Sequence, residues 1–268
     1  MKSAKFFYTA IIILLYGCNT YQTYEWENGS WIDLTHSFSD ETLYWPTSST
    51  FKKDTVFVGI TEGGFYYESF DICTAEHGGT HLDAPIHFYE GRKTVDQIGL
   101  NRLTGRAVVI DVTSQAATDR DYQITVEDII IWESEYGRIP EHSILLFYTG
   151  MGDYWPDPLQ YLGTEKRGTE GAAELSFPGI HPDTARWLVD NRKIIATGLD
   201  TPSLDYGKSN LFETHVILFE QNIPGFENVA NLHLLPPTGA FVIALPMKIK
   251  NGSGAPLRIV AHVPDIAP

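Results

Sequence analysis

The sequence predicts a single domain of the mixed α/β class. Segments with strand character outnumber helical ones, several helical segments lie between strands, and some strands read as continuous β-branched runs. The chain has 268 residues, of which 43% are hydrophobic, so it can bury a full core. Because no stretch resembles an interdomain linker or an internal repeat, we expect one domain.

Eight strands are expected. They cover residues 31–35, 54–60, 65–74, 106–112, 144–148, 194–199, 240–246 and 256–263. The run RAVVIDV at 106–112 is typical of a strand buried on both faces, and 144–148 and 194–199 have the same character. Cys73 lies within the third strand, and we expect a buried, inert thiol because no basic residue adjoins it.

Two helices are expected, at 125–134 and 181–191. Thr125 is a candidate N-cap with acidic residues in the first turn that follows. Pro182 occupies a favoured first-turn position, and apolar residues then line one face. These helices interrupt the strands, which predicts mixed sheets with flanking helices.

The N-terminus has the features of a targeting signal. Two lysines precede Phe6–Tyr16, an apolar run of eleven residues, whereas a membrane span needs about 20. The following Leu-Tyr-Gly-Cys at 15–18 resembles a bacterial lipoprotein signal, with Cys18 as the lipidated residue. An ordinary secretory signal with an incidental Cys18 is the alternative.

We therefore expect a signal peptide at 1–18, a polar tether at 19–30 and the folded domain at 31–266. The protein is expected to be exported to the bacterial cell envelope and to touch the membrane only through a lipid anchor at Cys18. The two cysteines, Cys18 and Cys73, exclude a disulfide framework if Cys18 carries lipid.

The balance of charged residues limits the kinds of binding partner to be expected. With 19 basic and 34 acidic residues the formal charge is −15, and Lys and Arg form no cluster. Nothing here is suited to neutralising a phosphate backbone, so no nucleic-acid partner is expected.

The densest group of metal-binding residue types lies between positions 77 and 87. Three of the nine histidines fall there, with Asp83 among them. Two glycines and a proline disfavour a helix, so we expect a loop that runs into an extended segment. His81 and Asp83 then point to the same side, and the glycines allow His77 to fold onto that side. Such a set suits Zn²⁺, Mn²⁺ or Fe²⁺, although core histidines satisfied by hydrogen bonds are the alternative.

The whole segment HGGTHLDAPIH at 77–87 resembles the His-x-Gly-Thr-His-x-Asp-x-Pro-x-His signature of the cyclase family of metal-dependent hydrolases, which includes bacterial kynurenine formamidases and isatin hydrolases. Further matching stretches lie at 31–46, 95–112, 198–207, 214–232 and 245–261. The resemblance covers nearly everything from Trp31 to Val263, and 114–175 is its least diagnostic part.

The resemblance implies a role for each matching residue. The implied metal ligands are His77, His81, Asp83, His215 and Glu227, with Asp83 able to bridge two metals. His87 is implied to be the general acid/base, and Trp45 to pack on the substrate ring with Phe88 nearby. The family fold is a swivelling β/β/α domain, usually a homodimer or homotetramer, and the cofactor is Zn²⁺ or Mn²⁺, one or two per chain.

The predicted function is metal-dependent hydrolysis of the C–N bond of an aromatic cyclic amide of the isatin kind, because the glycine-rich signature and the GSGAPLRIVA ending are more similar to isatin hydrolases. In this mechanism a metal-activated water attacks the carbonyl and His87 transfers the proton. An arylformamidase acting on N-formylkynurenine-like substrates is the alternative, and a non-catalytic metal- or ligand-binding lipoprotein is a third possibility. Asp200 and Asp205 flank a Thr-Pro-Ser turn, and turn chemistry explains them.

Overall fold

A computed structural model of the protein describes residue 26 and residues 28–265. The expected signal peptide, Cys18 and the tether up to residue 25 lie outside the described residues. Within the described part of the chain, no helix is both long and apolar enough to cross a membrane.

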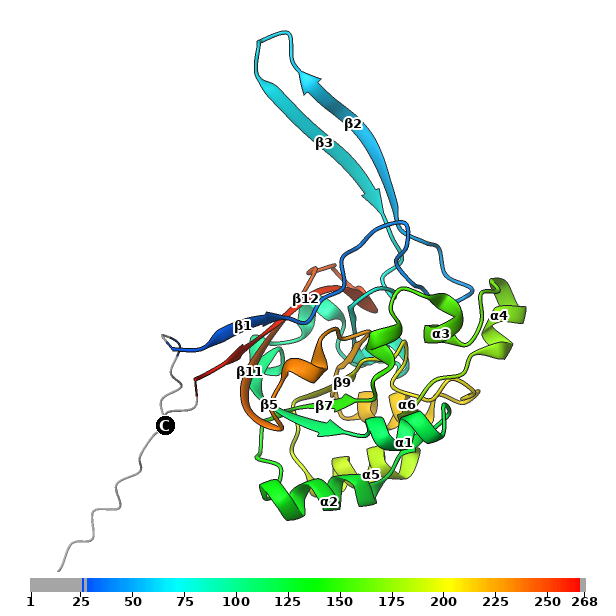
Figure 1. Cartoon of the computed structure of the whole chain (residues 1–268), viewed down its shortest axis with the longest axis vertical. Helices are drawn as coiled ribbons and strands as arrows, with labels where there is room; N and C mark the ends of the chain where they lie inside the picture. The colour runs from blue at the N-terminus through cyan, green and yellow to red at the C-terminus, as the bar shows by residue number, and fades with distance from the viewer. Residues whose placement is uncertain (1–25, 27, 266–268) are drawn as a thin grey trace, which may run out of the picture.

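The body of the molecule is built around one sheet that closes on itself (Figure 1). The sheet contains eight strands in the order β1-β12-β11-β5-β7-β9-β10-β4, and β4 also pairs with β12. Seven strands therefore form a closed, barrel-like ring, and β1 is added beside β12. Its strands are β1 (Ser30–Asp33), β4 (His81–Asp83), β5 (Thr104–Asp111), β7 (Ile144–Tyr148), β9 (Ala196–Leu199), β10 (Gly225–Glu227), β11 (Thr238–Pro246) and β12 (Gly254–Val263).

The central strands are buried on both faces, as predicted. Along β5, Val109 points into the core inside the ring, whereas Val108 and Ile110 point into a second core beneath the helices. Parallel pairing of β5 with β7 and of β7 with β9 repeats this arrangement. The continuous apolar runs of these strands are thus explained by two cores, one on each side of the sheet.

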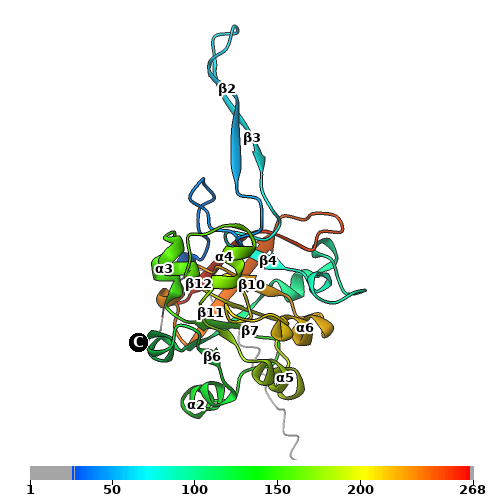
Figure 2. The same ribbon diagram turned by 90° about the vertical axis from the view of Figure 1, so that its right-hand side faces the viewer.

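Helices cover the outer side of β5, β7 and β9, with α2, α5 and α6 lying there (Figure 2). The α-helices are α1 (Thr113–Thr118), α2 (Val126–Tyr136), α3 (Pro158–Leu162), α4 (Gly168–Glu174), α5 (Pro182–Asn191) and α6 (Glu213–Glu220). Short 3-10 turns are η1 (Pro85–His87), η2 (Val95–Gln97), η3 (Leu100–Arg102), η4 (Met151–Tyr154) and η5 (Leu232–Leu234). Two further short strands, β6 (Gln123–Ile124) and β8 (Gly179–Ile180), pair with each other.

Both predicted helices are present, and their caps explain where they begin. Thr125 forms a capping box with Asp128, and the His181 side chain accepts a hydrogen bond from the amide of Asp183. Helix α6 was not predicted. It is apolar on nearly all sides and largely buried, so it shows little helical periodicity.

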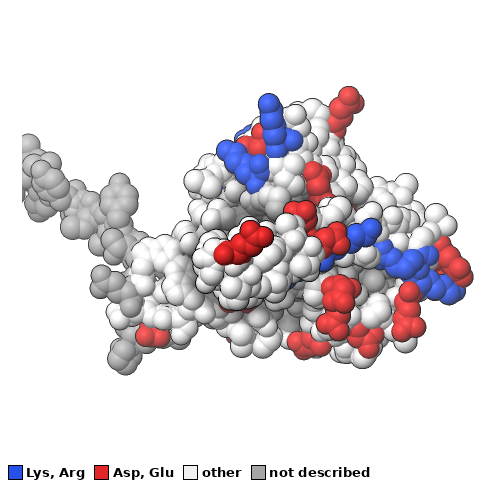
Figure 3. All heavy atoms as spheres, turned by 90° about the horizontal axis from the view of Figure 1, so that it is seen from above, with Lys and Arg blue, Asp and Glu red and all other residues white. Residues whose placement is uncertain are grey.

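Strands β2 (Lys52–Ile60) and β3 (Tyr66–Cys73) form a hairpin that projects from the body, and we call residues 52–73 the arm (Figures 1 and 2). Figure 3 looks down on the face from which the arm rises, where acidic side chains are scattered and basic ones form small groups. The prediction that Cys73 is buried was wrong. Its side chain is exposed, because no other layer of the described structure packs on the arm.

Candidate active site and metal centre

The predicted site residues come together in one cavity of about 250 Å³. Five parts of the chain supply them: the loop between β1 and β2 with Trp45, the loop before β4, β4 with η1 and the residue after it, the start of α6, and β10. The cavity is lined by Leu43, Tyr44, Trp45, Ser48, His77, Gly78, His81, Asp83, His87, Phe88, Leu162, Pro202, Ser203, Phe212, His215, Glu227 and Asn228. All eight residues predicted for metal binding, catalysis or substrate contact are among them.

Glycines give the histidine loop its shape. Gly79 has a left-handed backbone (φ 56°), and a Cβ at Gly78 would lie 2.0 Å from the Tyr44 ring. The partner strands of β4 also leave room, since Gly225 and Gly254 both stand opposite Asp83. A Cβ at Gly254 would lie 2.4 Å from the His77 ring, so this glycine makes space for that imidazole.

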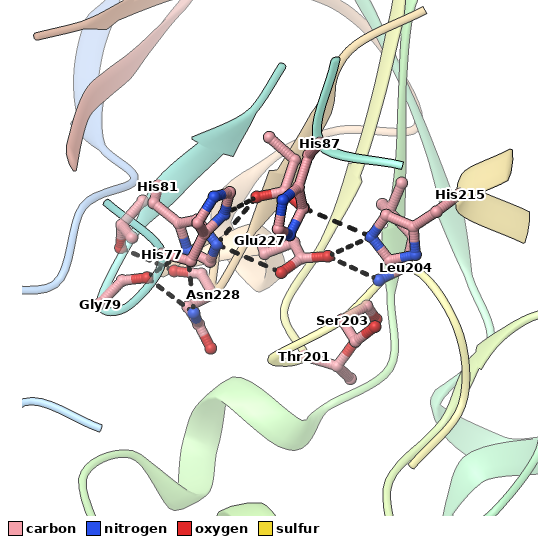
Figure 4. A network of polar contacts seen from close by, with 12 residues as sticks. His77, Gly79, His81, His87, Thr201, Ser203, Leu204, His215, Glu227 and Asn228 are labelled. Atoms are coloured by element: carbon pink, nitrogen blue, oxygen red, sulfur yellow. Dashed lines mark hydrogen bonds and ion pairs between the residues drawn. The ribbon is translucent and has the colours of Figure 1, made fainter. Parts of the chain in front are cut away.

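Asp83 lies at the centre of the polar network. Figure 4 shows the histidines and Glu227 of this network close together. Its Oδ1 is 2.7 Å from His77 Nδ1 and 3.1 Å from His81 Nε2. Its Oδ2 is 3.4 Å from His215 Nε2 and 3.9 Å from His87 Nε2. One buried carboxylate thus faces four imidazoles.

Glu227 completes the buried side of the network. Its Oε2 is 3.3 Å from His81 Nε2, and its Oε1 is 3.0 Å from His215 Nε2. The backbone amide of Leu204 donates to Oε1 at 2.8 Å, which fixes the carboxylate. His215 and Glu227 therefore belong to the same centre as the β4 residues, as the resemblance implied.

Asp205 orients His215, and its role was not predicted. Its Oδ2 is 2.6 Å from His215 Nδ1, and its oxygens also accept hydrogen bonds from the backbone amides of Thr214 and His215. Turn chemistry is therefore an incomplete explanation of Asp205. The same holds for Asp200, which is buried and accepts from the amides of Thr149, Gly150 and Gly152.

Asn228 and Ser253 hold candidate ligands in place, and neither residue was singled out from the sequence. The Asn228 amide donates to the carbonyl of Gly79 at 2.6 Å, and that carbonyl is 2.9 Å from His81 Nδ1. The hydroxyl of Ser253 is 2.9 Å from His77 Nε2 and donates to Glu76 at 2.6 Å. The only sequence signal for these residues was their place inside stretches that match the family.

The buried histidines and carboxylates shift one another's pKa values. Burial alone lowers the pKa of His81, but its bonds to Asp83 and Glu227 outweigh burial and raise the pKa to about 10. The pKa of His215 is likewise raised, against burial, by Asp205, Asp83 and Glu227. Burial favours a higher pKa for Asp83, but the surrounding imidazoles hold that pKa well below its usual range.

This donor set fits a divalent cation. Positive charge is favoured at the very point where the buried imidazoles and carboxylates converge, and each imidazole can exchange its proton for a metal. Ligand atoms of His81, Asp83 and Glu227 lie within 4.8 Å of one another, and so do those of His77, Asp83 and His87. Asp83 is common to both groups.

His87 differs from the buried candidate ligands in its exposure and in the direction of its pKa shift. Its ring stacks on His77 with 3.8 Å between centroids, and its side chain is partly open to the cavity. Burial lowers the pKa of His87 to about 4, although Asp83 opposes this shift. A neutral imidazole beside the Asp83 carboxylate is able to accept a proton.

Aromatic rings line the cavity beside the polar residues, and the Phe88 ring is 4.5 Å from the rings of both His87 and His215. The rings of Phe88 and Phe212 are 5.0 Å apart, and those of Trp45 and Phe212 are 6.1 Å apart. Trp45 and Phe88 were predicted, but Phe212 was not. Its backbone is left-handed (φ 49°) at the residue where α6 begins, a conformation that costs energy for a bulky side chain.

Comparison with known proteins identifies this combination of fold and site. The family described as "Putative cyclase" matches residues 32–206. The chain belongs to the cyclase family. An isatin hydrolase from Roseibium aggregatum is 31% identical over 212 residues, which is 76% of this chain and 78% of that protein. A kynurenine formamidase from Salinibacter ruber is 30% identical over 87% of this chain and 98% of its own length.

Solved structures agree with the cyclase assignment. Isatin hydrolase A from Labrenzia aggregata, bound to benzyl benzoate, superimposes with a TM-score of 0.79 and 32% identity over 88% of this chain and 94% of that one. An isatin hydrolase bound to the product analogue thioisatinate gives a TM-score of 0.78 at 27% identity over 89% of this chain and 94% of that one. The mixed α/β cyclase fold and a metal-dependent hydrolase acting on amide C–N bonds are thereby confirmed.

Proposed function

We propose that this cyclase-family enzyme opens the ring of an aromatic cyclic amide of the isatin kind, giving an aryl amine and a carboxylate. The observation that supports this substrate most is the cavity itself. Trp45, Phe88 and Phe212 give the cavity apolar ring surfaces, and the Phe88 ring is 4.5 Å from the rings of both His87 and His215. A planar aromatic substrate can pack on these rings while its carbonyl faces the imidazoles and carboxylates.

The chain's own residues account for the proton transfers. A divalent cation, when bound by His81, Asp83, Glu227 and their neighbours, supplies a water of lowered pKa and polarises the substrate carbonyl. His87, neutral at pH 7, accepts the proton of the attacking water and returns it to the departing nitrogen. The C–O bond forms as the C–N bond breaks, and the ring opens.

For the metal we propose Zn²⁺ or Mn²⁺, which accept the mixed imidazole and carboxylate donors found here. The two ligand groups that share Asp83 support one or two ions per chain. His81, Asp83 and Glu227 would hold one ion, and His77, Asp83 and His87 would hold a second one if it were bound. With a single ion, His87 would stay free for proton transfer.

Hydrolysis of an aryl formamide is the second candidate. The similarity to kynurenine formamidases over 87% of the chain favours it. The same residues serve the reaction, because a formamide also presents a carbonyl and an aryl nitrogen. Its products are formate and an aniline.

A comparison of substrates tests the proposal. Purified protein supplied with Zn²⁺ or Mn²⁺ is incubated with isatin and with N-formylkynurenine, and the products are identified by mass spectrometry. We expect isatin to gain one water with the higher kcat/KM. Preference for the formamide would establish the second candidate, and turnover of neither would refute the proposed substrate class.

For location and assembly, we propose an exported enzyme that is anchored to the bacterial envelope by lipid at Cys18 and that forms a homodimer or homotetramer. The support for the anchor is the Leu-Tyr-Gly-Cys pattern at 15–18. The support for assembly includes the uncovered apolar surface of the arm.

A further inference from the structure

A carboxylate with no part in the proposed mechanism lies behind His77. Glu76 accepts two hydrogen bonds from Ser253 at Oε2, one from the backbone amide at 3.0 Å and one from the hydroxyl at 2.6 Å. The same hydroxyl lies 2.9 Å from Nε2 of His77. The other ring nitrogen, Nδ1, is 2.7 Å from Oδ1 of Asp83. Glu76, Ser253 and His77 thus form a chain of polar contacts that leads to the centre of the network.

The chemistry of these groups fixes the direction of each hydrogen bond in the chain. A carboxylate is only an acceptor, and 2.6 Å is a usual length for a hydrogen bond from a hydroxyl to a carboxylate. The Ser253 hydroxyl therefore donates its single proton to Glu76 and offers only lone pairs to His77. Because two lone pairs repel each other, Nε2 of His77 must carry a proton and donate it to Ser253. Nδ1, which faces Asp83, is then the nitrogen that can give up its proton to a cation.

Ser253 is held in this position from two sides. Its backbone amide donates to Glu76, and its carbonyl accepts a hydrogen bond from the backbone amide of Ala84 at 2.8 Å. The next residue is Gly254, which leaves space for the His77 ring. The backbone of Ser253 is therefore fixed, and only the hydroxyl proton is left to choose between its two neighbours.

His81 shows why a hydroxyl needs a partner such as Glu76. Nδ1 of His81 lies 2.9 Å from the carbonyl of Gly79, and a carbonyl can only accept. That contact alone keeps a proton on Nδ1 and leaves Nε2 to face the network. A hydroxyl can donate as well as accept, so Ser253 by itself would not determine which nitrogen of His77 carries the proton. Glu76 removes this ambiguity.

We propose that Glu76 is a positioning residue: through the Ser253 hydroxyl it keeps a proton on Nε2 of His77, and Nδ1 is thereby the nitrogen presented to a divalent cation beside Asp83. Without Glu76 the hydroxyl can donate to Nε2, and the imidazole then keeps its proton on Nδ1, where the proton competes with a cation. The effect on metal affinity rests on the proposed role of His77 as a ligand. The position of the proton requires neither metal nor substrate.

Two substitutions of similar length separate hydrogen bonding from charge. Glu76→Gln loses the charge but keeps an acceptor oxygen, which the Ser253 amide orients toward the hydroxyl. Glu76→Met loses both the charge and the acceptor. Competition with a chelating dye measures the Zn²⁺ dissociation constants of the metal-stripped, full-length proteins. We expect Glu76→Met to bind Zn²⁺ about 10- to 100-fold more weakly than Glu76→Gln, and equal affinities would overturn the proposal.

The same two substitutions in a Ser253→Ala background show whether the hydroxyl transmits the effect. If it does, the ratio of the two Zn²⁺ dissociation constants should fall to about one, because no hydroxyl remains to be directed. An unchanged ratio would mean that Glu76 acts on the metal centre by another route, and the proposal would be wrong.

Nitrogen-15 NMR of the histidine rings locates the proton in the metal-free protein. The spectra are recorded at about pH 8.5, above the ordinary histidine pKa of about 6.5, and the His77 signals are assigned by their loss in His77→Gln. Nε2 of His77 should carry a proton in wild type and in Glu76→Gln, and should lack it in Glu76→Met. An unprotonated Nε2 in wild type would refute the proposal even if a Glu76 variant failed to fold. A wild type that hydrolyses no isatin but carries a proton on Nε2 would refute the proposed substrate while it supports the role of Glu76.

Discussion

Replacement of Asp205 by asparagine tests whether this carboxylate orients the candidate ligand His215. The carboxylate lies 2.6 Å from Nδ1 of His215 and accepts its N–H, so Nε2 is the ring nitrogen that is directed at Asp83 and Glu227 and that would face a metal ion. Asparagine keeps the size of the side chain but exchanges one acceptor for an NH₂ donor. In one orientation this donor meets His215 Nδ1–H, and in the other it meets the backbone N–H of Thr214.

The magnitude follows from these contacts. When the donor faces Nδ1, the imidazole adopts the other tautomer and presents Nε2–H to the metal position. Loss of such a supporting carboxylate typically lowers metal affinity or activity by about 10- to 100-fold, equivalent to roughly 1.4–2.8 kcal/mol. Because Asp205 also accepts two amides at the start of α6, we expect a further loss of about 1 kcal/mol in unfolding free energy.

Competition with a chelating dye measures the metal dissociation constant of metal-stripped Asp205→Asn, and urea unfolding measures its stability. Asp183→Asn is the matched control, since that carboxylate is exposed at the start of α5 and far from the cavity network. If Asp205→Asn binds metal as tightly as the control does, the orienting role is wrong.

Asp83→Ala is expected to abolish most metal binding, and full metal by elemental analysis would exclude Asp83 as a ligand. His87→Ala should keep its metal while turnover falls about 10²–10⁴-fold and the acidic limb near pH 4 disappears from the pH–rate profile; lost metal would make His87 a ligand. His36 stacks on Trp155, and burial lowers the pKa of His36 from 6.5 to about 4. Between these pH values the unfolded chain binds a proton at His36 that the folded chain does not, so the free energy of unfolding of the wild type falls as the pH drops from 6.5 to about 4. His36→Phe should reduce this loss by up to about 3 kcal/mol, as urea unfolding at pH 7 and pH 4.5 will show, and unchanged pH dependence would contradict it. Cys18→Ser should release the protein from the membrane fraction, whereas a wild type that is already soluble after cell fractionation would exclude the lipid anchor.

The parts of the site that could be predicted are local in sequence. His77, His81, Asp83 and His87 form one segment, so their spacing alone indicated a metal centre. The central strands were equally accessible, because β5 and β7 are continuous apolar runs buried by a core on each side.

The parts that escaped prediction depend on contacts between distant segments. Asn228 donates a hydrogen bond to Gly79, which is 149 positions away in the sequence, and no sequence pattern near Asn228 predicts that contact. Asp205 resembled a turn residue because its partner, His215, lies on a helix with little periodicity. Cys73 was expected to be buried and inert because no basic residue adjoins it in sequence, but its strand belongs to a pair that stands away from the body.

The pairing of β4 with β12 has a consequence for the order of synthesis, folding and metal binding. His81 and Asp83 stand opposite Pro256 and Gly254, so the ring closes only when almost the last residues of the domain are in place. Contacts this far apart in sequence form late and slowly. A ribosome-bound or truncated chain that ends before residue 254 lacks the strand that completes the metal centre. A divalent cation would therefore meet the fully supported set of candidate ligands only after the polypeptide is complete, in the compartment where the finished chain folds.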